Sequence, residues 1–390
     1  MNYILFDGAA RNQLLPFTYT KPVADLRFGI LTIREKWEKF LETTTTSITE
    51  EYLSERWPMV EMENNTMINA AVCPSESLVE QIKNLKEQQV LTFEDTYIAF
   101  RTKEEEEIDL DAFQEVKVHE EPLMIAHSWD IFAKNDQAIQ ADFDLLTKDR
   151  TSAEIPEGVF CVNKEQIFIE EGAKLTTASL NASNGPIYIG KDAEVMEFCA
   201  VRGPFALCEN ATLKMGAKIY GATTIGPHCK VGGEVNNSVI MGYSNKGHDG
   251  FLGNSVLGEW CNLGADTNNS NLKNNYAEVR MWDYETERFA PTGLQFCGLM
   301  MGDHSKCGIN TMFNTGTVVG VSANIFGAGF PRNFIPSFSW GGSSGTTTYK
   351  TNKAFEVAEK VMERRTIEFT EEDKAILEHV FEETKKFRRE

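Results

Sequence analysis

The stretch 244–260, SNKGHDGFLGNSVLGEW, gathers residues that could bind a polar ligand and remove a proton from it. His248 is the near-neutral titrating group among them, and a neutral imidazole can accept a proton from an amine or a hydroxyl group near pH 7. The polar residues around it that could hold such a ligand are Asn236, Lys246, Asn262, Asn271 and Arg280. A histidine in a glycine-rich loop can instead be a turn or packing residue, and a loop cation can simply be solvated. The stretch therefore indicates a candidate site, with both interpretations open.

A six-residue hydrophobic repeat surrounds this stretch. The aliphatic positions are Ile189, Val195, Val201, Leu207, Leu213, Ile219, Ile225 and Val231, and the repeat returns at Leu257 and Leu263 and again from Met301 to Ile325. A period of six fits neither a continuous helix nor a single strand. It predicts a coil of short strands and turns, stacked as a prism with the aliphatic side chains inside. The repeat breaks over 232–256 and 264–300, where we expect insertions that project from one face and carry binding residues.

Length and charge restrict the classes of function. The chain has 390 residues, enough for two or three domains, and a formal net charge of −20. We do not expect nucleic-acid binding, because that needs a basic patch that outweighs the repulsion from the rest of the protein. No apolar run reaches the roughly 20 residues of a membrane helix, and the start of the chain lacks the features of a signal peptide. We therefore expect a cytoplasmic protein without membrane contact, whose partners are small molecules.

The repeat divides the chain into three parts. Residues 1–150 show mixed helix and strand patterns and end in a polar connection, and residues 151–335 contain the repeat. Residues 336–390 begin with a link rich in glycine and serine and continue with two helical stretches. One helix is expected over 354–362 and the other from Thr370, where TEED forms a capping box. We expect these helices to pack against the prism or against a neighbouring subunit.

The repeat resembles that of the left-handed parallel β-helix proteins, and the left-handed coil is implied by this resemblance rather than by the period. The run from 244 to 271 resembles the acetyltransferase half of the bifunctional N-acetylglucosamine-1-phosphate uridyltransferase and glucosamine-1-phosphate acetyltransferase, with its motifs SKAGHxxYLG, xIGxxxNIGAGT and CNY. This likeness implies that His248 deprotonates the sugar amine for attack on acetyl-CoA. It places Asn262 and Asn271 at substrate-binding positions. Asn236 and Phe251 stand where the family has a lysine and a tyrosine, so the sugar and phosphate contacts are altered.

The start of the chain, ILFDGAARNQLLPFTYTKP, is similar to the pattern LxxGxGTRLxPLTxxxPKP of sugar nucleotidyltransferases. The resemblance implies that Gly8, Arg11 and Lys21 bind the nucleotide. It also implies that UTP is the nucleotide substrate and that Mg²⁺ is the metal cofactor. The pattern fails in detail, because NAAVCP at 69–74 has Ala71 where the family has its magnesium-binding aspartate. The metal ligands are therefore unknown, although Asp7 or Asp95 could substitute.

These resemblances imply an α/β nucleotidyltransferase-like domain followed by a left-handed parallel β-helix of hexapeptide repeats and short C-terminal helices, assembled as a homotrimer. The implied function is acetyl transfer from acetyl-CoA to glucosamine 1-phosphate and uridylyl transfer from UTP to N-acetylglucosamine 1-phosphate. One alternative keeps a single activity, with the other domain degenerate. A second alternative is an oligomeric scaffold without enzymatic activity.

Overall fold

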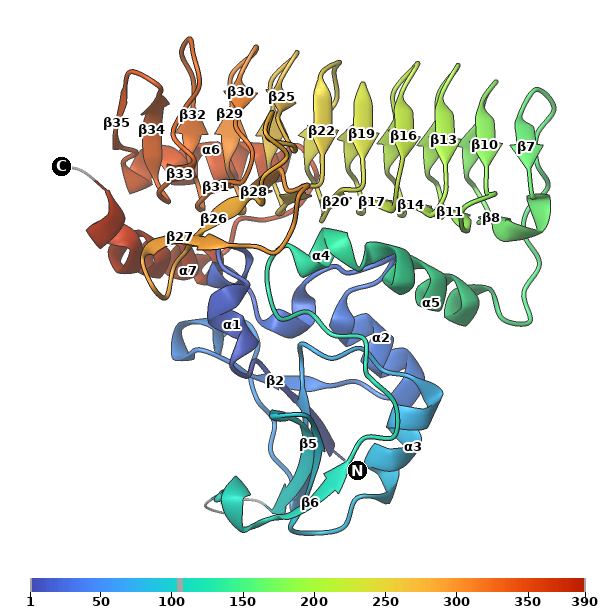
Figure 1. Ribbon diagram of the computed structural model, residues 1–390, viewed down its shortest axis with the longest axis vertical. Coiled ribbons are helices and arrows are strands. Elements are labelled where there is room, and N and C mark those ends of the chain that lie inside the picture. The colour runs from blue at the N-terminus through green and yellow to red at the C-terminus, as the bar shows by residue number, and fades with distance from the viewer. Residues whose placement is uncertain (1, 104–107, 389–390) are drawn as a thin grey trace. The chain divides into compact units, whose positions relative to one another are not determined.

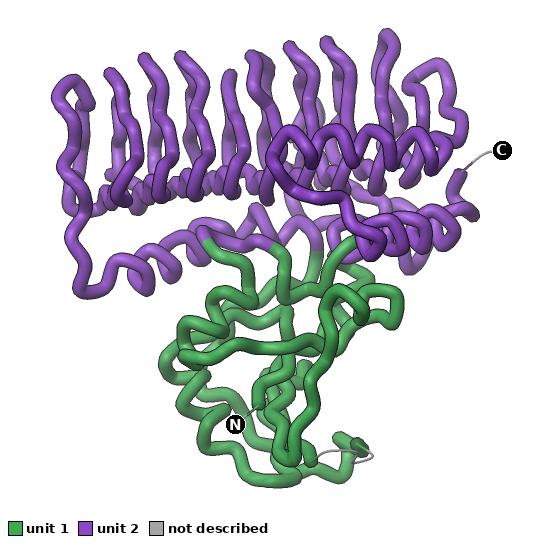
Figure 2. The backbone as a smooth tube through the Cα atoms, turned by 180° about the vertical axis from the view of Figure 1, so that it is seen from behind, with its two compact units in different colours: residues 1–14, 20–26, 31–127 green, residues 15–19, 27–30, 128–390 purple. Residues whose placement is uncertain are grey.

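The computed structural model describes residues 2–103 and 108–388, and the chain forms two compact units (Figure 2). The first unit comprises Met1–Leu14, Thr20–Leu26 and Leu31–His127, and the second comprises Leu15–Tyr19, Arg27–Ile30 and Ser128–Glu390. The predicted fold class is confirmed: an α/β domain is followed by a parallel β-helix and short C-terminal helices (Figure 1). Among the helices of the described residues, none combines the length and the apolar composition needed to cross a bilayer.

The first unit is built on a six-stranded sheet of order β2-β1-β3-β5-β4-β6. Its strands are β1 (Asn2–Phe6), β2 (Thr46–Ile48), β3 (Asn64–Asn69), β4 (Gln89–Phe93), β5 (Thr96–Lys103) and β6 (Gln114–Lys117). Its α-helices are α1 (Ala10–Gln13), α2 (Ile33–Leu41) and α3 (Glu76–Asn84). Strand β1 is parallel to β2 and β3, so the segments that follow β1 and β3 meet at one edge of the sheet, where parallel α/β sheets bind ligands.

The second unit is a prism whose three sides are parallel sheets (Figure 1). The first sheet contains β7 (Phe160–Val162), β10 (Ser179–Asn181), β13 (Ala200–Arg202), β16 (Lys218–Tyr220), β19 (Glu234–Asn236) and β22 (Phe251–Gly253). The second contains β8 (Ile167–Ile169), β11 (Ile187–Ile189), β14 (Phe205–Leu207), β17 (Thr223–Ile225), β20 (Val239–Ile240), β23 (Val256–Leu257), β28 (Leu299–Met301), β31 (Thr317–Val319) and β33 (Phe334–Ile335).

The third sheet of the prism carries the site described below. It contains β9 (Lys174–Leu175), β12 (Glu194–Val195), β15 (Thr212–Leu213), β18 (Lys230–Val231), β21 (Asn245–Lys246), β24 (Asn262–Leu263), β29 (Lys306–Cys307), β32 (Asn324–Ile325), β34 (Ser339–Gly342) and β35 (Gly345–Thr348). The strands are parallel except for the β34–β35 hairpin at the end. A further pair, β25 (Asn268–Asn269) and β30 (Met312–Phe313), continues the coil beyond the first sheet.

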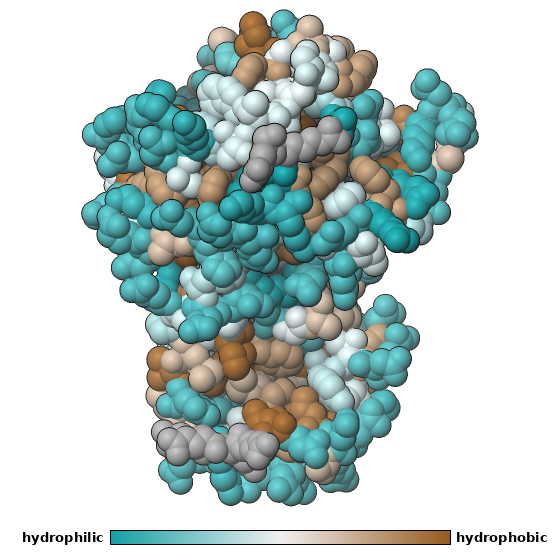
Figure 3. Space-filling view, turned by 90° about the vertical axis from the view of Figure 1, so that its left-hand side faces the viewer, coloured by the Kyte–Doolittle hydropathy of each residue, from teal (hydrophilic) through white to brown (hydrophobic). Residues whose placement is uncertain are grey.

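The six-residue repeat forms the core of the prism, as predicted. Val201 and Ile219 of the first sheet, Leu207 and Ile225 of the second, and Leu213 of the third are all buried in one hydrophobic cluster. Each aliphatic residue is followed six positions later by one from the next sheet, so every coil contributes three side chains to the interior. Hydrophilic side chains predominate on the face of the molecule in Figure 3, and hydrophobic residues form smaller groups between them.

The first break in the repeat is not an insertion, so that expectation is wrong. Residues 232–256 form coils in register, with β18 paired to β21, β19 to β22 and β20 to β23. The inward residues Val231, Val235 and Ile240 are only four and five positions apart, because two corners of the coil are shorter than in the regular repeat. The site residues in this stretch are therefore fixed on the coil rather than carried by a projecting loop.

The second break is an insertion, as predicted. The coil advances from Leu257 to its register partner Met301, and the intervening chain includes the antiparallel hairpin of β26 (Arg280–Asp283) and β27 (Arg288–Pro291).

Helices also flank the prism: α4 (Asp130–Ala133), α5 (Asn135–Thr147), α6 (Thr351–Glu363) and α7 (Glu371–Glu383). The capping box predicted at Thr370 is present, with Asp373 as its partner. Asn135 at the start of α5 donates hydrogen bonds to the Ala222 carbonyl and the Thr224 hydroxyl, both at 3.1 Å, and so fixes α5 against the second sheet.

Candidate functional site

A row of polar side chains runs along the outer face of the third sheet. Lys230, Asn245, Asn262 and Lys306 are the first residues of β18, β21, β24 and β29, and they are aligned in register. The next residue in each strand points into the prism, so these four side chains point outward. Neighbouring strands lie about 4.8 Å apart, so the row spans about 14 Å from Lys230 to Lys306. The sheet thus presents two cations with two amides between them.

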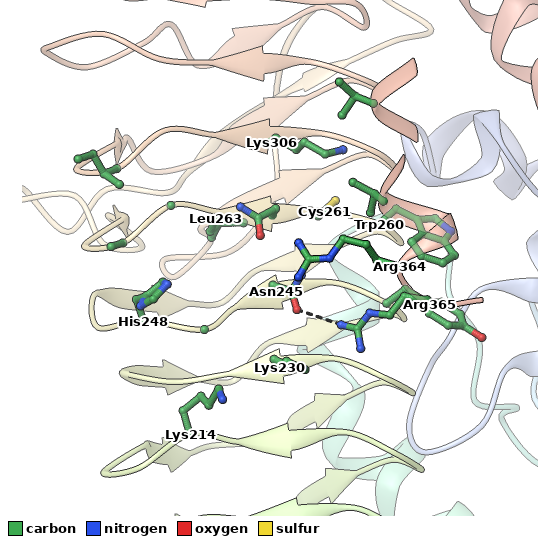
Figure 4. Close-up of a pocket in the computed structure, with 18 residues that line it drawn as sticks. Lys214, Lys230, Asn245, His248, Trp260, Cys261, Leu263, Lys306, Arg364 and Arg365 are labelled. Carbon is green, nitrogen blue, oxygen red and sulfur yellow. Dashed lines mark hydrogen bonds between the residues drawn. The ribbon is translucent and has the colours of Figure 1, made fainter. Parts of the chain in front are cut away.

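Helix α6 and the residues after it form the opposite wall of a pocket of about 700 Å³ (Figure 4). Val357 and Val361 of α6 line it, and Arg364 and Arg365 follow at the end of the helix. In Figure 4 both arginines reach across the strands towards Asn245, and Arg365 donates a hydrogen bond to the Asn245 side-chain oxygen at 3.4 Å. The pocket therefore has an apolar strip beside its charged groups.

Five cationic side chains line this pocket: Lys214, Lys230, Lys306, Arg364 and Arg365. Within residues 2–103 and 108–388, none of the five forms an ion pair with a carboxylate. Burial lowers the pKa of Lys230, and the neighbouring charges of Arg365, Lys214 and Arg364 lower it further. Burial also lowers the pKa of Lys306 to about 8. Such a concentration of positive charge is unfavourable in the empty protein, and a bound anion would relieve it.

His248 lies at the corner that follows β21 and lines the same pocket. Its side chain is exposed, and Figure 4 shows it on the far side of the strands from Arg364 and Arg365. The pocket thus combines a group that can accept a proton with a group of cations that can hold a phosphorylated molecule.

A ladder of aromatic rings supports one end of the pocket. His228, Tyr243, Trp260 and His304 stack with centroid separations of 4.8, 4.3 and 6.2 Å. Each of the four residues has a left-handed φ between 54° and 61°, because each occupies the equivalent turn of its coil, between the second and third sheets. Tyr243 and Trp260 contribute to the pocket wall, so this wall is fixed by stacking from above and below.

The structure brings together only two of the residues predicted for this site. His248 and Asn262 line the pocket. Asn236 and Phe251 belong to the first sheet, in β19 and β22. Two further predicted residues lie elsewhere: Asn271 donates a hydrogen bond to the Asn254 side-chain oxygen at 2.8 Å, and Arg280 lies in the β26–β27 hairpin, where it donates to the Phe289 carbonyl.

Lys246 differs most from the expectation of a substrate-binding cation. It is the register partner of Val231 and occupies the same inward position, with a side chain only 2% exposed. Its ammonium donates hydrogen bonds to the carbonyls of Gly232 at 2.9 Å and His248 at 2.8 Å. The ammonium is therefore enclosed in the protein and is not placed to bind a phosphate in the pocket.

Sequence reasoning missed the five cations of the pocket. A signal for two of them exists in the repeat: Lys230 and Lys306 immediately precede the inward residues Val231 and Cys307, so they had to point outward from one sheet. Arg364 and Arg365 form a pair of cations at the end of a predicted helix. That this helix lies against the third sheet depends on tertiary packing, which the pattern does not specify.

The first unit holds the three residues predicted to bind a nucleotide. Gly8 follows β1 with a φ of +61°, and a Cβ atom at Gly8 would lie 3.4 Å from the Asn69 side chain. Arg11 is buried and donates to the Asp7 carboxylate at 2.7 Å. Lys21 is also buried, at 4% exposure. Burial raises the pKa of Asp7 despite the neighbouring Arg11 guanidinium.

The residues near Gly8 do not fit a magnesium ion. Ala71, which stands at the family's aspartate position, is fully buried and offers no carboxylate. The Asp7 carboxylate accepts hydrogen bonds from Arg11, from the Thr49 hydroxyl at 2.5 Å and from the Val23 amide at 2.8 Å, so its oxygens are already engaged. The described residues also contain no cluster of three or more histidine, cysteine or acidic side chains that could hold a metal.

Comparison with known proteins assigns a relationship to the N-terminal part of the chain. Residues 3–151 match the family model of sugar nucleotidyl transferases. This match supports a sugar-related transferase. No curated protein matches the sequence.

The solved structures that match this chain have low similarity to it as a whole. The polysialic-acid-specific acetyltransferase NeuO has 13% identity and a TM-score of 0.27, covering 54% of this chain and 94% of its own. The UDP-N-acetylglucosamine acyltransferase of Francisella novicida has 14% identity and a TM-score of 0.26, covering 60% of this chain and 89% of its own. The Arabidopsis enzyme of that name has 13% identity and a TM-score of 0.24, covering 60% and 99%.

Proposed function

We propose that the prism catalyses acyl transfer from acetyl-CoA to an amino sugar phosphate, with His248 as the general base. The observation that carries this proposal is that an exposed imidazole and five cations without carboxylate partners in the described structure share one pocket. In a chain with a net charge of −20, such a cationic pocket favours a ligand with several phosphate charges. Acetyl-CoA and a sugar 1-phosphate are both ligands of this kind.

The proposed step needs only a positioned base and charge stabilisation. The acceptor ammonium releases one proton to solvent on binding as a neutral amine, and His248 accepts the second proton that the nitrogen must lose to become an amide. The amine nitrogen then forms a bond to the thioester carbonyl carbon, and the carbon–sulfur bond breaks as the tetrahedral intermediate collapses. The imidazolium returns its proton to the departing thiolate, so the products are an amide and free coenzyme A.

The pocket offers a different role to each group. Arg364 and Arg365 can make charge-assisted hydrogen bonds to phosphate oxygens, as can Lys230 and Lys306. Asn262 is exposed in the same row and can donate to the sugar or to the oxyanion of the intermediate. We propose glucosamine 1-phosphate as the acceptor, because its amine and its phosphate match the base and the cations.

We further propose that the active protein is a cytoplasmic homotrimer in which a neighbouring prism completes the site. His248 lies two positions after the inward residue of its coil, and Met215 and Ile309 occupy the equivalent position in other coils. These two apolar side chains are 69% and 70% exposed, and Phe198 in the same row of corners is 75% exposed. An apolar row that flanks the candidate base is a suitable surface for a second copy of the chain.

For the first unit we propose nucleotide binding without uridylyl transfer. The match to sugar nucleotidyl transferases and the glycine turn after β1 favour a nucleotide site. The poor fit of Ala71 and Asp7 to magnesium favours the alternative in which this domain has lost its transfer reaction. Incubation with UTP, N-acetylglucosamine 1-phosphate and magnesium should then release no pyrophosphate, although UTP should still raise the melting temperature. Steady pyrophosphate release would restore the bifunctional assignment.

The experiment that tests the acyltransferase proposal is His248→Ala. Thiol release from acetyl-CoA in the presence of glucosamine 1-phosphate should fall about 10²–10⁴-fold, the usual contribution of a general base. Binding of acetyl-CoA, measured by calorimetry, should change little, because the cations are intact. The matched control is His379→Ala, which removes an exposed histidine of α7 and should leave turnover unchanged. Unchanged turnover in His248→Ala would remove the base assignment.

A further inference from the structure

The interior of the third sheet contains a lysine, Lys246, at a position that the neighbouring coils give to apolar residues. Lys246 follows Val231 in the third sheet, where Val195 and Leu213 occupy the same position in the preceding coils. Enclosing an ammonium group costs several kcal/mol, even when hydrogen bonds compensate part of this free energy. A methionine would fill a similar volume without that cost. The choice of lysine therefore needs a reason beyond packing.

The reason lies in what the ammonium contacts. It donates to the carbonyls of Gly232 and His248, which belong to two successive corners of the coil. These corners are packed so closely that a Cβ atom at Gly233 would lie 2.8 Å from the Asp249 backbone and 2.9 Å from the His248 carbonyl oxygen. The Lys246 ammonium thus joins the corner that carries the candidate base to the corner below it.

This connection occurs where the coil is irregular. Val231 and Val235 are separated by four positions instead of six, so the corner under His248 is shorter than those of the regular repeat. Backbone hydrogen bonds hold the two ends of the His248 corner, from Gly232 to the Lys246 carbonyl at 2.8 Å and from Glu234 to the Gly250 carbonyl at 3.2 Å. Between these ends, the Lys246 ammonium donates a hydrogen bond to the His248 carbonyl at 2.8 Å.

The charges around Lys246 are consistent with an enclosed structural cation. Burial lowers its pKa to about 8, Asp249 and Asp266 act against this shift, and Lys218 adds to it. A primary amine has N–H donors in both protonation states, so it can hold the two carbonyls on either side of that pKa.

We propose that Lys246 is a positioning residue for His248: its interior ammonium holds the His248 carbonyl and so fixes the direction in which the imidazole faces the pocket. The inference rests on the proposed role of His248 as the base. It assigns to Lys246 a role opposite to that of a ligand-binding cation, because its effect reaches the substrate only through the geometry of another residue.

The first test is Lys246→Met, with Lys218→Met as the matched control. Lys218 is an exposed lysine of β16, so its substitution removes the same group from the surface. We expect Lys246→Met to lower kcat for acyl transfer at least about tenfold, since small misplacements of a catalytic group have effects of this size. The KM for acetyl-CoA should stay within about twofold, because the pocket cations are untouched. A purely structural role would instead lower the melting temperature and leave kcat per folded molecule unchanged.

The second test does not depend on activity. Hydrogen exchange of the amides of residues 247–250 should accelerate at least about tenfold in Lys246→Met, while the amides of the neighbouring strands keep their protection. Lys246→Gln, which retains a shorter donor, should give intermediate exchange and should serve if the methionine variant does not fold. Wild-type exchange rates at 247–250 in both variants would overturn the inference. If the wild type itself shows no acyl transfer but the exchange result is as expected, the proposed function fails while Lys246 is still established as the clamp of this corner.

Discussion

The two units of the chain each contain arginines that could bind a phosphate, but only the arginine of the first unit is paired with carboxylates. In the first unit, Arg11 lies 2.7 Å from the Asp7 carboxylate and 3.4 Å from that of Glu50. In the prism, Arg364 and Arg365 share a pocket with three lysines and have no carboxylate partner among the described residues. The Arg11 charge is therefore compensated by carboxylates without a ligand, whereas the charges of Arg364 and Arg365 are not.

This difference indicates that the charge of Arg11 stabilises the fold, whereas the charges of Arg364 and Arg365 are available to a ligand. A buried ion pair that also satisfies its hydrogen bonds is complete, and a ligand would have to break it. A cationic pocket in an acidic protein is instead stabilised by adding an anion. Sequence resemblance predicts that Arg11 binds a phosphate. The lack of a compensating carboxylate instead indicates Arg364 and Arg365.

The largest effect should come from breaking the compensated pair. Asp7→Ala leaves the buried Arg11 guanidinium without its partner and also removes the acceptor for the Val23 amide and the Thr49 hydroxyl. We expect the free energy of unfolding of the first unit to fall by about 3–5 kcal/mol, measured by urea denaturation. Glu50→Ala is the control, because the Glu50 side chain is 54% exposed and should contribute less than about 1 kcal/mol. Equal losses in the two variants would show that the Asp7 pair is not the structural centre of this loop.

The next effect should come from removing the uncompensated charges. The double variant Arg364→Ala with Arg365→Ala should raise the Kd for acetyl-CoA at least about 10–100-fold, because the loss of one charge-assisted hydrogen bond alone costs about 1.5–3 kcal/mol. Its melting temperature should not decrease, since neither arginine forms an ion pair in the described structure. Lys353 and Lys360 lie on the same helix and pair with Glu356 and Glu363 at 2.8 Å, so their double substitution by alanine is the control. A pocket that binds acetyl-CoA equally well in both double variants would contradict the proposed phosphate contacts.

The sequence predicts those parts of the structure that depend on local interactions. The repeat from Ile189 to Val231 predicts the coil, because each aliphatic residue must reach the same interior. The same rule fails at Lys246, since the corners at Val231 and Val235 are shortened and the count of six no longer identifies the inward position. A lysine in a projecting insertion is solvated, whereas Lys246 lies on a continuous coil and is enclosed.

Only the part of the pocket that lies on the coil could be predicted from the sequence. A motif predicts His248 and Asn262, and the repeat predicts the outward direction of Lys230 and Lys306. The other half comes from α6, whose contact with the third sheet joins residues more than a hundred positions apart. No local pattern specifies which face of a solenoid a terminal helix covers, so the arginines could not be assigned to the site from the sequence.

A smaller effect should accompany a change of pH. Burial sets the pKa of Lys306 at about 8 and lowers that of Lys230, so both lose protons in the pocket at a lower pH than in the unfolded chain. The Kd for acetyl-CoA should therefore rise about tenfold between pH 7 and pH 9, as Lys306 becomes neutral. The free energy of unfolding of the unliganded protein should rise over this interval, because the unfolded state binds more protons than the folded state and loses that advantage as the pH increases. Lys306→Gln should flatten the affinity profile; an unaltered profile in that variant would exclude Lys306 as a phosphate ligand.

The smallest effect should be a gain of stability from Lys230→Gln. This substitution keeps most of the side-chain length and removes one of the charges that repel Arg364, Arg365 and Lys214. Because Lys230 is exposed to solvent, which screens its repulsion, we expect the unliganded protein to be stabilised by only about 0.5 kcal/mol or less in thermal denaturation. The Kd for acetyl-CoA should rise at the same time about 3–10-fold, since the same charge contributes to ligand binding. A variant that loses both stability and affinity would mean that Lys230 is compensated within the protein, as Arg11 is, and the distinction between the two units would then not hold at this residue.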